Sequence, residues 1–210
     1  MIHSPAKEQA PIRAVLFDIG NVLLRFDFSK ALRRIAAQCA AFEEAGALVL
    51  IDQVKVPFEE GRIDRAAFLR GVIDVIRYRG SEAEFVAAWE EIFEPNLPMV
   101  TLVKELHGKL PLYLLSNTSD IHREYVFRQY PIFGRFTAGV YSYEARASKP
   151  GRRIYEIAIE QLGLEPASTF FIDDLLPNIE TARSLGFHAH HYHHEAHDRL
   201  LADLAALGLP

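Results

Sequence analysis

The sequence predicts an α/β fold, a three-layer and doubly wound parallel sheet of the Rossmann-like type, with a small all-helical cap inserted after the first strand. Two observations favour this fold. Short apolar runs of strand length alternate with helical segments over most of the chain, as expected for a parallel sheet with helices on both faces. Between about residues 29 and 93 the alternation stops, and that stretch holds several helical patterns and no convincing strand.

The first strand is expected at residues 14–17, an apolar run without polar alternation, which is typical of a central strand covered on both faces. Asp18 follows directly, and Gly20 comes two positions later. In open α/β sheets ligands bind at the carboxyl ends of the strands, so Asp18 is placed for chemistry. An Asp that only caps the following turn is the alternative, and one acid does not decide between the two.

The helical insertion divides the chain. We assign a core domain, a helical cap and a flexible N-terminal tail to residues 12–26 with 96–210, 27–95 and 1–11, respectively. Within the cap, Asp64 is suited to begin one helix, and Ser81 opens another with a capping box. The cap residues that could face the site include Arg62, Phe68, Arg70 and Trp89. We expect the two aromatic ones in the cap's own core.

After the cap, the alternation of strand and helix resumes. Strands are expected at residues 112–115, 138–141, 170–172 and 187–192. Helices are expected from Pro98 to near Gly108, at 119–129, ending at Gly163, at 177–185 before Gly186, and at 195–207. This order predicts that the sheet is parallel.

Polar side chains follow several of these strands where each strand ends. Ser116 and Asn117 follow the second strand, Lys149 precedes a helix after the third, and Asp173 and Asp174 follow the fourth. Because parallel strands end at one edge of a sheet, we expect them to converge with the acid of the first strand. Two adjacent carboxylates repel each other unless a cation compensates, and Mg²⁺ prefers such oxygen ligands. A helix-capping pair is the alternative, which explains one Asp better than two.

These motifs, in this order, resemble those of the haloacid dehalogenase-like (HAD) superfamily, whose members are mostly Mg²⁺-dependent phosphohydrolases. The resemblance runs from about Ile12 to about His190. The Phe-Asp-x-Gly-Asn-Val form of the first motif is similar to a bacterial sugar-phosphatase branch that includes glucose-1-phosphate phosphatases. The resemblance implies a phosphatase of a small phosphorylated metabolite, with a sugar phosphate such as glucose 1-phosphate as substrate and an aspartyl-phosphate intermediate.

The resemblance also implies roles for single residues. Asp18 would be the nucleophile, and Lys149 would screen it from the incoming phosphate and steady the transferred group. Ser116, with the backbone N–H groups that follow it, would hold the phosphate, and Asn117 and Asn21 would also lie on the substrate side.

The implied metal site uses the same strand ends. Asp18, the Gly20 carbonyl and Asp174 would bind Mg²⁺ directly. Asp173 would bind the ion through a water molecule or support the direct ligands without touching the ion. Asn178, four residues after Asp174, would brace the metal loop.

Gly20 is the largest departure from the family pattern, because most phosphatases of this superfamily carry there a second Asp that protonates the leaving oxygen. The chain is therefore either a phosphatase that manages without this acid or a catalytically weak binding or regulatory protein. For an active enzyme, we expect anomeric sugar phosphates to react faster than 6-phosphates, since their leaving group needs less acid help. Hydrolytic 2-haloacid dehalogenation is a further alternative, but it uses no Mg²⁺, and the Asp173–Asp174 pair argues against it.

Six histidines lie between residues 188 and 197. On a strand, His188 and His190 face one side and His191 and His193 the other, so most of them cannot converge on one ion. We expect a solvated strand end, with adventitious transition-metal binding as the alternative.

Composition excludes other classes of protein. The net charge of −5 gives no basic surface for nucleic acid, and no stretch is apolar enough for a membrane span. Cys39 is the single cysteine, so neither a disulfide framework nor a thiolate metal site is available. These features, and an N-terminal segment without an apolar leader, favour a cytoplasmic monomer or homodimer with a small-molecule substrate.

Overall fold

The computed structural model describes residues 10–39 and 44–210, so most of the predicted tail at 1–11 lies outside the described residues. Its main sheet has five strands in the order β5-β4-β1-β6-β7, and every neighbouring pair is parallel. The strands are β1 (Ala14–Phe17), β4 (Leu112–Ser116), β5 (Ala138–Tyr141), β6 (Thr169–Asp173) and β7 (His188–His191). The predicted doubly wound parallel sheet is confirmed.

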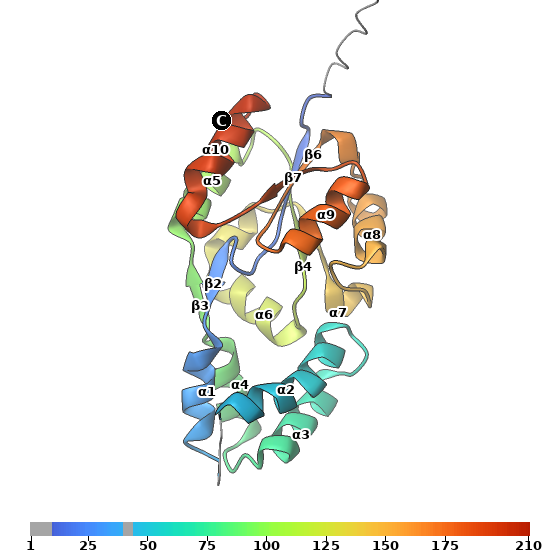
Figure 1. The fold of residues 1–210 in the computed structure, drawn as a ribbon. Coiled ribbons are helices and arrows are strands. Elements are labelled where there is room, and N and C mark those ends of the chain that lie inside the picture. Colours follow the sequence, from blue (N-terminus) through green and yellow to red (C-terminus); the bar gives the residue numbers. More distant parts are fainter. Residues whose placement is uncertain (1–9, 40–43) are drawn as a thin grey trace, which may run out of the picture.

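Helices cover both faces of this sheet (Figure 1). One face is covered by α5 (Leu97–Leu106), α6 (Asp120–Gln129) and α10 (His197–Ala206), and the other by α8 (Arg152–Leu162) and α9 (Leu176–Ser184). Val15 and Phe17 of β1 pack against the first group of helices, and Ala14 and Leu16 pack against the second group. Because both faces are buried, the strand had to be apolar at every position.

Shorter helical segments complete the core. They are η1 (Pro131–Arg135), α7 (Ser142–Ala145), η2 (Pro166–Ser168) and η3 (His194–Ala196). Gly163 ends α8 in the left-handed conformation, with φ +63°, and Gly186 follows α9 with φ +93°, as the sequence predicts for helix ends. In the described part of the chain no helix has both the length and the apolar character needed to cross a membrane.

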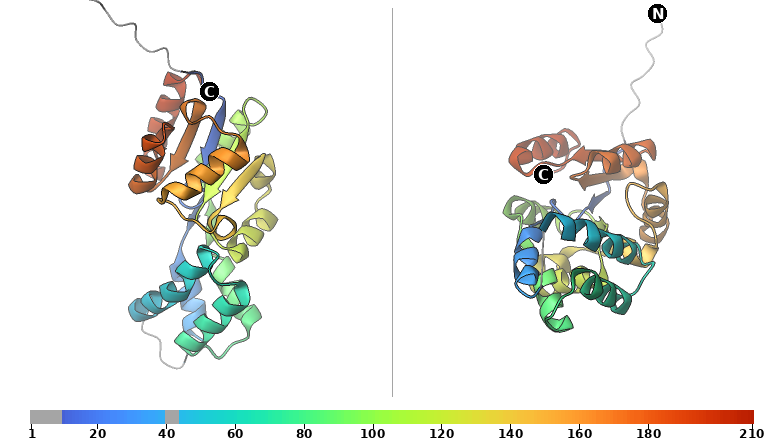
Figure 2. Two further views of the ribbon diagram at one scale, coloured as in Figure 1. Left: turned by 90° about the vertical axis from the view of Figure 1, so that its right-hand side faces the viewer. Right: turned by 60° about the horizontal axis from the view of Figure 1, so that its bottom comes forward.

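Four helices form a separate layer at the end of the core away from the C terminus (Figure 2). They are α1 (Phe28–Ala36), α2 (Glu44–Glu59), α3 (Arg65–Ile76) and α4 (Glu82–Glu90). Asp64 caps α3 by accepting from the Ala67 N–H, and Ser81 opens α4 with a complete capping box. Phe68 and Trp89 are fully buried in this layer's own apolar cluster, as predicted.

A two-stranded antiparallel ribbon joins the cap to the core, and the sequence did not predict it. β2 (Leu24–Phe26) pairs with β3 (Phe93–Pro95), with Leu24 opposite Pro95 and Phe26 opposite Phe93. No strand was expected between about residues 29 and 93, and β3 begins at Phe93; β2 lies before that stretch, at a place where no strand was expected either. Each strand is three residues long, too short for a period of two to be visible, and its partner lies far away in the chain. The ribbon places Phe26 directly beside the end of β1.

Candidate active site

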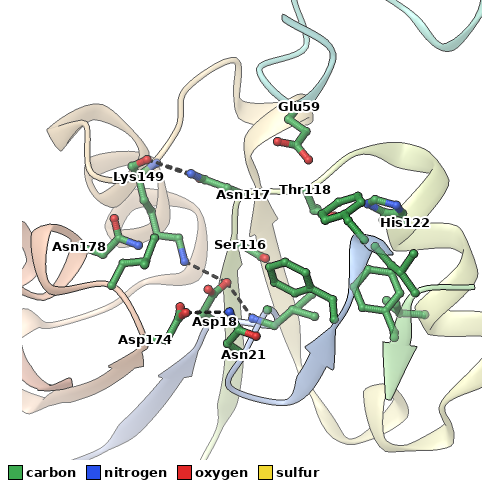
Figure 3. A pocket seen from close by; sticks show the side chains of 18 of the residues that line it. Asp18, Asn21, Glu59, Ser116, Asn117, Thr118, His122, Lys149, Asp174 and Asn178 are labelled. Atoms are coloured by element: carbon green, nitrogen blue, oxygen red, sulfur yellow. Dashed lines mark hydrogen bonds and ion pairs between the residues drawn. The ribbon is translucent and has the colours of Figure 1, made fainter. Parts of the chain in front are cut away.

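The carboxyl ends of β1, β4 and β6 open into one cavity of about 290 Å³ between the core and the cap (Figure 3). The predicted residues that line it are Asp18, Gly20, Asn21, Ser116, Asn117, Lys149, Asp174 and Asn178. Asp173, by contrast, is completely buried and lies behind the lining. The structure thus brings together at one edge the residues that the sequence distributes over four segments.

Lys149 is the centre of the buried polar network. Its Nζ lies 2.9 Å from Asp18 Oδ1, 2.6 Å from Asp173 Oδ2 and 2.8 Å from the Leu115 carbonyl oxygen. An ammonium group has three N–H donors, so these three acceptors occupy all of them. Burial lowers the pKa of Lys149, but the two carboxylates outweigh that effect and raise it above its ordinary value. The side chain is therefore held charged and fixed in direction.

The surroundings of Asp18 disfavour the ionised form of its side chain. Burial raises its pKa to about 7; Lys149 opposes this, while Asp173 and Asp174 add to it. Burial also raises the pKa of Asp174, against the hydrogen bond that the Asn21 amide donates to its Oδ2 over 3.0 Å. Oxygens of the three acids lie within 4.8 Å of one another, with one lysine to balance them. This crowded set of hard oxygen donors fits a small divalent cation such as Mg²⁺.

Amide side chains fix the loops around this network. The Asn117 side chain donates to the Lys149 carbonyl over 2.8 Å and accepts from the Lys149 N–H over 2.9 Å, which ties the end of β4 to the lysine loop. Asn178 Nδ2 and the Leu175 N–H donate to Asp173 Oδ1 over 2.8 and 2.9 Å. These bonds leave the other oxygen of Asp173 for Lys149, so the predicted bracing residue Asn178 acts on Asp173.

The Phe26 side chain occupies the space next to Gly20. A Cβ atom at position 20 would lie 3.0 Å from Phe26 Cε1 and 3.5 Å from Cδ1. The Phe26 ring is held edge-on against Phe28, with centroids 5.6 Å apart, and against Phe93 at 6.4 Å. A ring, and no carboxylate, therefore borders the cavity above Gly20.

The cavity wall also holds residues that were not predicted from the sequence, among them Phe26, Phe28, Lys55, Glu59 and His122. Burial lowers the pKa of His122 to about 4, so its ring is neutral near pH 7 and donates from Nε2 to the Trp89 carbonyl over 3.1 Å. Lys55 and Glu59 are four residues apart on a helix, and this spacing is the one sequence signal for any of these residues. It does not identify a cavity residue, because exposed charge pairs on helices have the same spacing.

The histidines of the C-terminal segment do not assemble a metal site. His190 Nδ1 pairs with Asp203 Oδ2 over 2.7 Å, whereas His191 points the other way and donates from Nε2 to the Asp174 carbonyl over 2.8 Å. Among residues 10–39 and 44–210, the acidic group at Asp18 is the one cluster of three metal-capable side chains.

The chain belongs to the haloacid dehalogenase-like hydrolase family, whose sequence model matches residues 12–186. It is similar to the D-ribitol-5-phosphate phosphatase of Bacteroides thetaiotaomicron, with 25% identity over 185 residues that cover 84% of this chain and 89% of the relative. It is also similar to the sesquiterpene phosphatase astK of Aspergillus oryzae, with 25% identity over 180 residues, 83% of this chain and 86% of the relative.

Among solved structures, the fold is similar to that of a HAD family enzyme of Bacteroides thetaiotaomicron in complex with magnesium and inorganic phosphate. The TM-score is 0.76 and the identity 29%, over 85% of this chain and 93% of the other.

Proposed function

We propose that the protein is a Mg²⁺-dependent phosphatase of a small phosphorylated metabolite, acting through an aspartyl-phosphate on Asp18. The observation that carries the proposal is the group of Asp18, Lys149, Asp173 and Asp174, the first three of them buried, at a cavity between the core and the cap. Charged groups in such proximity cost stability, and a chain that only bound a partner would gain nothing from them.

Each step of phosphoryl transfer has a candidate group. The free oxygen of Asp18 attacks phosphorus, since its Oδ1 accepts from Lys149 and from the Ile19 N–H. Lys149 offsets the negative charge of the nucleophile and the phosphate, and the Ser116 hydroxyl at the end of β4 holds a phosphate oxygen. Mg²⁺, held by Asp18, Asp174 and the Gly20 carbonyl, would neutralise charge on the phosphate. Water then hydrolyses the aspartyl-phosphate.

The relatives support this reaction class. Two of them are named phosphatases, and a structural neighbour was crystallised with magnesium and inorganic phosphate. Their named substrate classes, a polyol phosphate and a terpenoid phosphate, differ in the leaving group, so substrate choice depends on this chain's own cavity. We propose a sugar or polyol phosphate, with glucose 1-phosphate as the first candidate from the form of the first motif.

The test is phosphate release with and without Mg²⁺ on glucose 1-phosphate, glucose 6-phosphate, ribitol 5-phosphate, farnesyl monophosphate and p-nitrophenyl phosphate. We expect Mg²⁺-dependent turnover that Asp18→Asn abolishes and that the exposed control Asp198→Asn retains. Halide release from a 2-haloacid in the presence of a chelator would instead establish a dehalogenase. No turnover on any substrate would favour a binding protein.

A further inference from the structure

The cap contributes a pair of opposite charges to the cavity that the reaction described above does not use. Lys55 and Glu59 lie one turn apart at the end of α2, and both line the cavity. Lys55 Nζ is 2.8 Å from Glu59 Oε2. Figure 3 shows the Glu59 side chain reaching from the cap toward Asn117 and Thr118 of the core. The pair therefore faces the space that a leaving group would occupy.

The burial of this pair sets it apart from an ordinary charge pair on a helix. The side chains of Lys55 and Glu59 are 20% and 19% exposed, whereas those of Arg152 and Glu156, an i,i+4 pair on α8, are 65% and 41% exposed. Removing charges from water costs free energy that a single ion pair does not return in full. The fold alone gives no reason to place this pair in a cavity.

The pair also has unused hydrogen-bonding capacity. Among the described residues, the bond between Lys55 and Glu59 is the one side-chain hydrogen bond that either group makes. An ammonium group has three donors and a carboxylate about four acceptor sites, so most of them remain free. A hydroxyl group can donate to the carboxylate and accept from the ammonium, and a hydrocarbon can do neither.

Aromatic side chains line the same space beside this pair. Phe26 and Phe28 line the cavity, and Lys55 Nζ lies 5.7 Å from the centre of the Phe28 ring. An aromatic face suits the C–H surface of a ligand, and a charged pair suits its hydroxyl groups. A sugar or a short polyol presents both kinds of surface.

Resting on the phosphatase function proposed above, we propose that Lys55 and Glu59 form the leaving-group subsite and select substrates whose leaving group carries several hydroxyl groups. Glu59 accepts hydrogen bonds from two hydroxyls, Lys55 donates to one, and Phe26 and Phe28 cover the carbon skeleton. A leaving group without hydroxyls leaves the remaining donors of Lys55 and acceptors of Glu59 without partners, which disfavours its binding.

The experiment compares kcat/KM for a polyol or sugar phosphate with kcat/KM for p-nitrophenyl phosphate, whose leaving group has no further hydroxyl. In Glu59→Gln and Lys55→Met, which keep the size of each side chain, we expect the ratio of the two values to fall about tenfold or more. The loss should lie mainly in KM for the hydroxylated substrate. Arg152→Gln and Glu156→Gln, from the exposed pair, should leave the ratio unchanged within twofold.

The outcomes separate this proposal from the one on which it rests. A wild-type enzyme that hydrolyses p-nitrophenyl phosphate with Mg²⁺, together with an unchanged ratio in both cap variants, would overturn the subsite and leave the phosphatase standing. Equal losses on both substrates would also overturn it, because a structural role lowers both. A wild-type chain that hydrolyses neither substrate would remove the phosphatase function itself.

Discussion

The absence of a side chain at Gly20 predicts which phosphate esters react fastest. No carboxylate lies two positions after Asp18, the proposed nucleophile, so a leaving oxygen would depart with little acid help. General-acid assistance is worth about two orders of magnitude or more. The hemiacetal hydroxyl of glucose 1-phosphate is more acidic than the alcohol of glucose 6-phosphate. We therefore expect the rate of aspartyl-phosphate formation, measured in a single turnover, to be at least about tenfold higher for the 1-phosphate; equal rates would rule out this account.

Phe26 predicts why a simple substitution at Gly20 fails. A Cβ atom there meets the ring at 3.0 Å, so an Asp side chain cannot enter without displacing it. We expect Gly20→Asp alone to lower kcat/KM on glucose 6-phosphate. Combined with Phe26→Ala, the same change should raise it about tenfold over Phe26→Ala alone, because the acid then has room. If Gly20→Asp gave the full gain by itself, the ring would not be the obstacle.

At the scale of single residues, the sequence predicts the groups that directly follow a strand. Asp18, Ser116 and Asp174 each come at the end of an apolar run, and that position alone brings them to one edge of the sheet. Phe26 and Glu59 belong to no such pattern. Their place in the cavity depends on how the ribbon and the cap pack on the core. That packing cannot be read from the pattern of the sequence.

The turn between α2 and α3 holds the cap against the core. Gly61 has φ +64°, and a Cβ atom there would lie 2.0 Å from the carbonyl oxygen of Tyr143 in α7. On the same side of the cap, Arg65 of α3 bridges to Asp120 and Glu124 of α6 over 3.0 and 2.6 Å. Glu59 lies two residues before Gly61, so a displaced turn would move the charged pair of the cavity.

Gly61→Ala should therefore impair catalysis as well as stability. We expect kcat/KM on the best substrate to fall about tenfold or more because the methyl group pushes the turn from α7. Gly163→Ala is the matched control, since Gly163 has φ +63° with open space around it. Gly163→Ala should cost about 1 kcal/mol of unfolding free energy from the left-handed backbone, as measured by urea denaturation, and Gly61→Ala should cost more because its methyl group also meets backbone atoms of α7. Similar kcat/KM values for the two variants would contradict a role of the contact in the site.

At the scale of elements, strands and helices were predicted correctly where a continuous apolar run or a capping residue marks them in the sequence. β1 is apolar at every position because helices cover both faces, and the capping residue Asp64 and the capping box at Ser81 mark helix starts locally. β2 and β3 were missed because three residues of backbone pairing leave no periodic pattern. These strands nevertheless shape the site, because this ribbon places Phe26 in the cavity wall beside Gly20.

For the whole molecule, the acidic cluster couples stability to metal and to pH. The pKa of Asp18 is raised from 3.8 to about 7 in the folded protein, mainly by burial. Between these values the folded state binds a proton that the unfolded chain does not, so the Asp18 contribution to stability of the metal-free protein falls as pH rises. If Asp18 binds Mg²⁺ as proposed, the ion would have to displace that proton below about pH 7 and would meet an ionised carboxylate above it.

The thermal shift caused by Mg²⁺ should therefore grow with pH and level off above about pH 7. Each pH unit below that point weakens binding by up to tenfold, about 1.4 kcal/mol, which for a domain of this size corresponds to about 3 to 5 °C. Differential scanning fluorimetry with Mg²⁺ or chelator from pH 5 to 8 measures it. Asp18→Asn carries neither the proton nor the charge, so its metal-free form should be more stable than wild type at pH 8 and its Mg²⁺ shift small at every pH. An equal Mg²⁺ shift at pH 5 and pH 8 in the wild-type protein would show that the ion binds without Asp18, and the metal site would have to be sought elsewhere.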